Sequence, residues 1–89
     1  MYIITNFSMG DEAWFMYRDK AISSKVISIT AIICFDSLDS IDNNSFINIR
    51  INYKFKFYIK YDDGSWEDIN VEIPQRKVFR TRQELLNSI

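Results

Sequence analysis

Apolar and polar residues alternate over residues 46–61. The odd positions from Ile47 to Tyr61 are apolar or aromatic, and the even positions between them are Asn, Arg, Lys or Tyr. This period of two predicts a β-strand with one buried face and one face in solvent. A flat strand of this length spans roughly 50 Å, whereas a compact domain of this size is about 25 Å across. We therefore predict that the strand bends and that the sheet closes into a small barrel.

A hairpin turn follows this strand. Residues 62–64, Asp-Asp-Gly, fit a three-residue loop in which the Gly takes the left-handed conformation. With this loop, Phe57 pairs with Ile69, so the apolar side chains of both strands lie on one face. A two-residue loop would instead set apolar residues opposite lysines. The returning strand ends at Pro74, which has no backbone N–H to donate.

The N-terminal half predicts shorter strands separated by polar turns. Residues 27–35 again show a period of two, and the polar interval 36–45 predicts a surface loop because Asp, Asn and Ser favour turns. We expect strands at residues 2–7, 12–17 and 25–35. The first of them is an apolar edge strand through which two copies of the chain could pair.

The C-terminal segment predicts a short helix. Thr81 and Glu84 form a capping box, and Leu85, Leu86 and Ile89 follow as an apolar stripe. A helix this short is not stable alone, so it must dock on the sheet. The predicted fold is thus a single mainly β domain over residues 1–89. It consists of a small antiparallel barrel of about five strands with a short C-terminal helix.

The composition restricts the chemistry of the chain. It has no His, one Cys and two Gly in 89 residues. These counts exclude a Ser-His-Asp triad, a Cys-His pair, an internal disulfide, a zinc cluster and an iron–sulfur cluster. Cys34 lies in an apolar run and is expected to act as a buried small hydrophobe. The acidic cluster of Asp62, Asp63, Glu67 and Asp68 does not match the EF-hand pattern, and a chain this short rarely builds the cleft that paired catalytic carboxylates need. We therefore expect no catalytic residue, no metal and no cofactor, and predict that the protein is not an enzyme.

Charge and hydropathy bear on location and partners. No apolar run is long enough to span a bilayer, and the N-terminus lacks the pattern of a signal peptide. We therefore expect a cytoplasmic protein without a membrane partner. The net charge of −1 argues against a protein that coats nucleic acid, although eight of the 11 basic residues lie in residues 46–89.

Two motifs resemble known proteins. The Gly-Asp-x-x-Trp motif of residues 10–14, followed by a strand from residue 25, resembles the opening of SH3-like barrel proteins. The Phe-x-Thr-x-x-Glu-Leu-Leu motif of residues 79–86 is similar to the ending of a group of small bacterial and phage proteins. The resemblance implies an SH3-like barrel and a non-enzymatic binding role. The resemblance further implies that the protein is a phage-type accessory protein or an inhibitor that acts on a host protein machine.

The leading hypothesis is a protein-interaction module. Trp66 follows the hairpin turn and its parity places it on the outward face, and Trp and Tyr are enriched at interface hot spots. The basic segment 76–82 would suit an acidic partner. Alternatively, the aromatic side chains pack in the core, and the basic segment is a connector whose charges only keep it in solvent. The predicted partner-binding residues are Tyr58, Trp66, Arg76, Lys77, Arg80 and Arg82.

Nucleic-acid binding is the second hypothesis. Arg50, Lys54, Lys56 and Lys60 share one face of the long strand with Tyr58, where they could follow a phosphate backbone while the ring stacks on a base. The alternative is a solvated sheet face, because the predicted register sets Glu72 opposite Lys54 and Asn70 opposite Lys56. A third hypothesis is a protein that sequesters a small ligand. It requires a pocket among the aromatics or at an oligomer interface.

Overall fold

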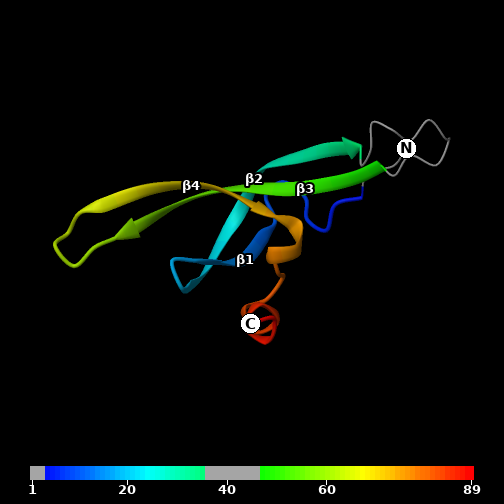
Figure 1. Cartoon of the computed structure of the whole chain (residues 1–89). Helices are drawn as coiled ribbons and strands as arrows, with labels where there is room; N and C mark the ends of the chain where they lie inside the picture. Colours follow the sequence, from blue (N-terminus) through cyan, green and yellow to red (C-terminus); the bar gives the residue numbers. More distant parts are fainter. Residues whose placement is uncertain (1–3, 36–46) are drawn as a thin grey trace.

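The fold is an open antiparallel sheet with one short helix. The computed structural model describes residues 4–35 and 47–89 of the chain. Within them, the four strands form one sheet in the order β1-β2-β3-β4, and every neighbouring pair is antiparallel (Figure 1). The elements are β1 (Glu12–Tyr17), β2 (Lys20–Phe35), β3 (Ile47–Lys60), β4 (Trp66–Pro74), the 3₁₀ helix η1 (Gln75–Lys77) and α1 (Arg82–Asn87).

The hairpin of β3 and β4 has the predicted register. Phe57 pairs with Ile69, and the three-residue loop ends at Gly64, whose φ of +87° is the left-handed conformation. The Gly64 amide donates to the Tyr61 carbonyl at 3.0 Å. β4 ends at Pro74, as expected. The alternation of apolar and polar residues therefore predicted the strand, and alternation and loop length together predicted its pairing, since a one-residue slip would set apolar residues opposite lysines.

The second strand begins earlier in the chain than the sequence predicted. β2 starts at Lys20 rather than at residue 25, because a two-residue turn connects it to β1 and Tyr17 pairs with Lys20. Both turn residues have positive φ, 48° at Arg18 and 62° at Asp19. This geometry matches the twist of the flanking strands. The polar residues predicted a turn here, but neither Arg18 nor Asp19 is Gly or Asn, so the two-residue length of the turn and the early start of β2 were not predicted.

The expected closure of the sheet into a five-stranded barrel is wrong. β2 pairs with β1 through residues 20–25 and with β3 from Val26 onward, with a register shift between Val26 and Ser28. β1 and β4 are the two edges of the described sheet and do not pair. An isolated β-bridge between Trp14 and Phe79 connects β1 to the segment that follows β4.

The long strand extends rather than bending into a barrel. The molecule measures 59 × 25 × 23 Å, and the β3–β4 hairpin continues past the end of the contact with β2 (Figure 1). We call this part, residues 56–70, the arm. β2 turns at its register shift, so that β1 folds over one face of β3. β1 thereby buries the apolar face of β3, although β3 does not bend as the size of a compact domain had led us to predict.

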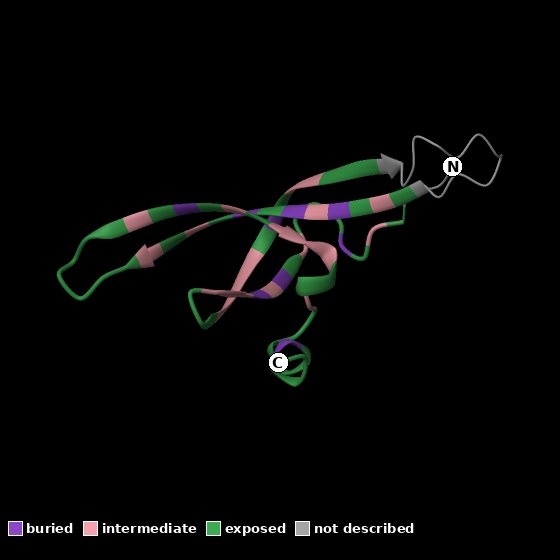
Figure 2. Cartoon of the chain, in the orientation of Figure 1, coloured by how far each residue is buried: buried purple, intermediate pink, exposed green. Residues whose placement is uncertain are grey.

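The core lies between β1 and the inner face of β3. The rings of Phe15 and Phe55 lie 4.4 Å apart between centroids, and Phe57 lies 5.8 Å from Phe15. Figure 2 shows buried positions on β1 and along the middle of β3, whereas the turn of the arm is exposed. The buried cluster consists of Phe7, Ala13, Phe15, Val26, Ile51, Tyr53, Phe55 and Val78.

The segment before β1 is not the predicted edge strand. Residues 2 and 3 lie outside the described residues, and residues 4–7 form no strand. Phe7 is instead buried, with its ring edge-on to Tyr53 at 5.4 Å. The apolar run therefore supplies a core residue, and its described part does not provide the edge through which two copies were expected to pair. The expected surface loop at residues 36–45 lies outside the described residues.

The C-terminal helix forms with part of the predicted capping box. The Glu84 amide donates to the Thr81 hydroxyl at 3.1 Å, but the Glu84 carboxylate accepts from the Arg80 amide rather than from Thr81. Leu85 is buried, whereas Leu86 and Ile89 are 37% and 80% exposed. The helix therefore docks on the sheet through one side chain of the expected stripe.

Candidate functional site

The outer face of β3 and β4 is an exposed polar surface that carries two aromatic rings. Strand alternation places its residues together, since the even positions of both strands point away from the core. The exposed residues of this outer face are Asn48, Arg50, Lys54, Lys56, Tyr58, Lys60, Trp66, Asp68, Asn70 and Glu72.

An aromatic pair occupies the arm end of this face. Tyr58 and Trp66 are 58% and 63% exposed, and their rings meet edge to face with centroids 6.5 Å apart. The Lys60 ammonium lies 5.3 Å from the centre of the Trp66 ring. This contact follows from the register, in which Lys60 pairs with Trp66. The prediction that Trp66 points outward is confirmed, and the aromatic pair offers a large apolar contact area flanked by a cation.

The four cations of β3 share this face and form no ion pair among the described residues. In that part of the chain, the ion pair that forms joins Arg18 to Glu67. Glu72 lies opposite Lys54, and Asn70 lies opposite Lys56, as the register predicted. The structure therefore brings Arg50, Lys54, Lys56 and Lys60 onto one face with the aromatic pair. Asp68 and Glu72 interrupt the positive charge of that face.

The basic segment 76–82 lies at the other end of β4. β4 runs from Trp66 to Pro74, a length of roughly 26 Å at about 3.3 Å per residue. Arg76 and Lys77 are exposed on η1, and Arg82 is the first residue of α1. The six predicted partner-binding residues thus fall into two separate groups, Tyr58 with Trp66 and the four basic residues.

Arg80 has a structural role within the second group. Its guanidinium lies 4.7 Å from the centre of the Phe7 ring and donates to the Asn6 carbonyl. These contacts hold the N-terminal segment against the chain that follows β4. Arg80 is therefore less available to a partner than Arg76, Lys77 and Arg82, which belong to the same group.

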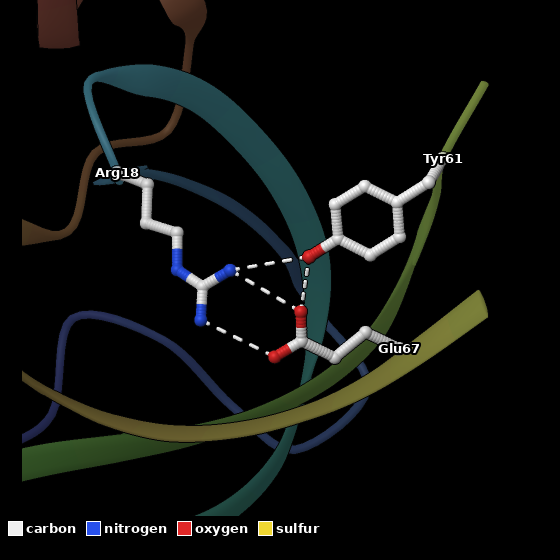
Figure 3. A network of polar contacts seen from close by, with 3 residues as sticks. All are labelled: Arg18, Tyr61 and Glu67. Atoms are coloured by element: carbon white, nitrogen blue, oxygen red, sulfur yellow. Dashed lines mark hydrogen bonds and ion pairs between the residues drawn. The ribbon is translucent and has the colours of Figure 1, made fainter. Parts of the chain in front are cut away.

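A network that the sequence did not reveal joins the arm to the first hairpin (Figure 3). The Arg18 guanidinium donates to both carboxylate oxygens of Glu67 at 3.2 Å and to the Tyr61 hydroxyl at 3.3 Å, and Tyr61 donates to Glu67. The hydrogen bond from Tyr61, followed by those from Arg18, lowers the pKa of Glu67. The same bond to Glu67 raises the pKa of Tyr61.

This network lies on the opposite side of the arm from the aromatic pair. Tyr61 and Glu67 occupy odd positions, which belong to the inner face of the hairpin, and Arg18 reaches them from the turn between β1 and β2. It holds the arm against the first hairpin. No sequence pattern could have paired Arg18 with Glu67, because 49 positions separate them.

Among the described residues, no cluster of His, Cys, Asp and Glu side chains is arranged to hold a metal ion. Nor does any helix in that part of the chain have the length and apolar character needed to cross a membrane.

Comparison with models of known protein families, with curated proteins and with solved structures finds no match to this chain. The resemblance to SH3-like proteins of bacteria and phages therefore stays a prediction, and the functional argument depends on the geometry of the outer face.

Proposed function

We propose that the protein is a non-enzymatic interaction module that binds a protein partner through the outer face of its arm. The observation that supports this most is the exposed pair of Tyr58 and Trp66 with Lys60 beside it. Solvent-exposed aromatic surface of this size gains free energy when a partner covers it. Trp and Tyr at the centre of an interface contribute most of the binding energy.

The charges around the aromatic pair favour a protein partner over a polyanion. The four cations of this face lie on β3 and two carboxylates lie on the neighbouring β4, with Asp68 opposite Tyr58 and Glu72 opposite Lys54. A phosphate backbone would meet both carboxylates, whereas a protein surface can complement each sign in turn. The resemblance to small phage proteins extends the proposal to an accessory or inhibitor of a host protein machine.

The test is affinity capture from a nuclease-treated lysate with matched variants. Tyr58→Ser combined with Trp66→Ser removes the aromatic pair from an exposed position, so the fold is expected to remain intact. Met9→Ser is the control, because Met9 is also exposed, at 67%, but lies far along the chain from the arm. A partner retained by the wild type and by Met9→Ser, but lost by the double variant, would support the proposal. A partner retained equally by all three would contradict it.

Single-strand nucleic-acid binding is the second candidate. It is favoured by the finding that the aromatic pair and the four cations of β3 lie on one face, since stacking rings and phosphate-binding cations occur together in such sites. Fluorescence anisotropy with a labelled oligonucleotide at increasing salt tests it. Four phosphate contacts predict a slope of roughly −3 for log K against log salt. Lys54→Glu with Lys56→Glu should then abolish binding, and unchanged binding in this variant would exclude the candidate.

A further inference from the structure

A groove separates the C-terminal helix from the sheet. It lies between β1, the end of β4, η1 and α1, and has a volume of about 600 Å³. Its apolar wall includes Met16 on β1, Ile73 on β4, Phe79 after η1, and Leu85 on α1. This volume lies within the range of sites that enclose small molecules.

The groove is open because the helix is attached by few side chains. Leu85 is the buried residue of α1, and Ile89, which also lines the groove, is 80% exposed. The side chains of the helix therefore do not fill the space beside Met16 and Ile73. Apolar surface left in water in this way favours an apolar occupant, at roughly 25 cal/mol for each Å² that is covered.

Two cations lie at the edge of this apolar surface. Arg76 and Lys77 are consecutive residues of η1, both are exposed, and both line the groove. Neither forms an ion pair with a carboxylate in the described part of the chain, where the ion pair that forms is that of Arg18 and Glu67. A guanidinium and an ammonium that line the same groove can both bind a carboxylate through charge-assisted hydrogen bonds.

We propose that this groove binds a small amphiphilic carboxylate, an organic anion with a hydrocarbon tail. The tail lies against Met16, Ile73 and Phe79, and the carboxylate binds Arg76 and Lys77. The apolar walls account for the tail, and the two cations, which pair with no carboxylate among residues 4–35 and 47–89, account for the head. This site is separate from the outer face of the arm and does not depend on the function proposed for that face.

The test is a titration of the isotope-labelled full-length protein with decanoate, below the concentration at which it forms micelles, followed by amide NMR spectra. Saturable binding with shifts confined to residues near Met16, Phe79 and Leu85 is expected. Arg76→Ala with Lys77→Ala should raise the dissociation constant roughly tenfold, since it removes charge-assisted hydrogen bonds. The control Lys54→Ala with Lys56→Ala removes the same number of cations from β3 and should leave the dissociation constant unchanged.

Three results would overturn the proposal. Non-saturable binding, or shifts centred on β3, would show that decanoate adsorbs without using the groove. Decanol binding as tightly as decanoate would show that the two cations do not select a carboxylate. Binding of an acidic, apolar peptide without any binding of decanoate would assign the groove to a protein segment. Because none of these results measures the binding of a protein partner to the outer face of the arm, a failure here leaves the function proposed for the arm untouched.

Discussion

At the residue scale, Tyr53 connects three parts of the chain. Its ring is fully buried, and its hydroxyl accepts from the amides of Asn6 at 3.0 Å and Phe7 at 3.3 Å and donates to the Gln75 side chain. One side chain on β3 thus holds both the segment before β1 and the start of η1. The alternation of residues predicted that Tyr53 faces inward, but nothing near it in the sequence indicated which groups its hydroxyl would reach.

Removing this hydroxyl should destabilise the protein without changing its shape. Tyr53→Phe keeps the ring but leaves the buried Phe7 amide without an acceptor, which costs about 1–3 kcal/mol of the free energy of unfolding. Urea unfolding followed by circular dichroism measures this loss. Tyr58→Phe, at an exposed position, is the matched control and should change the midpoint little. Equal midpoints for the two variants would show that the Tyr53 hydroxyl contributes nothing to stability.

The network of Arg18, Tyr61 and Glu67 predicts how stability depends on pH. The pKa of Glu67 is lowered in the folded state, so its contribution is present above the pKa of an unfolded Glu and is lost as pH falls through the folded value. The pKa of Tyr61 is raised, so its contribution is present below the pKa of an unfolded Tyr and is lost as pH rises through the folded value. Stability from this network is therefore greatest at intermediate pH.

Thermal melting across this pH range tests the network. The difference in melting temperature between the wild type and Glu67→Gln should be largest near neutral pH. It should shrink both below pH 4 and above pH 10, near the ordinary pKa values of the two groups. Because Arg18 and Tyr61 are exposed and Glu67 is only half-buried, screening by salt should reduce the difference. A difference that is the same at every pH would show that the network contributes nothing through its charges.

At the element scale, the hairpin of β3 and β4 was predictable because its determinants are local. Alternation sets which face is buried, and the three-residue loop sets the register. β2 was predicted only in part. The polar turn before it was expected, but not that the turn is two residues long, which starts β2 at Lys20 and pairs its first residues with β1. The helix α1 was predicted from Thr81 and Glu84, but the side chains that dock it depend on the surface of the sheet beneath.

Gly64 is the residue on which the hairpin loop depends. Its φ is +87°, and no atom lies within 4 Å of the position that a Cβ would occupy. Gly64→Ala should therefore cost about 1–2 kcal/mol through backbone conformation alone. Urea unfolding should show the loss, and Gly64→Asn should recover part of it because Asn tolerates the left-handed region better. An Ala variant as stable as the wild type would show that the loop adopts another conformation.

At the scale of the whole molecule, the open sheet makes the protein elongated. Its radius of gyration is 16.6 Å over Cα atoms, whereas a compact chain of this length has a value of about 12 Å. Small-angle X-ray scattering should give a radius of gyration close to the larger value and a long dimension near 59 Å. A value near that of a compact chain would show that the arm folds back in solution. The outer face of the arm and the groove beside the C-terminal helix would then no longer be separate sites.

The sequence by itself determined the mainly β class, the register of the β3–β4 hairpin, the cap at Thr81 and the outward direction of Trp66. These features depend on a period of two and on turn and cap residues that are neighbours in the chain. Only the tertiary structure decided that the sheet stays open, that Phe7 enters the core, and that Arg18 reaches Glu67. It also decided that the basic segment lies far from Trp66 and beside a groove. These features depend on contacts between residues that are distant in the sequence. β2 changes direction at its register shift and so places β1 on the face of β3, and the local alternation of residues does not specify where that shift occurs.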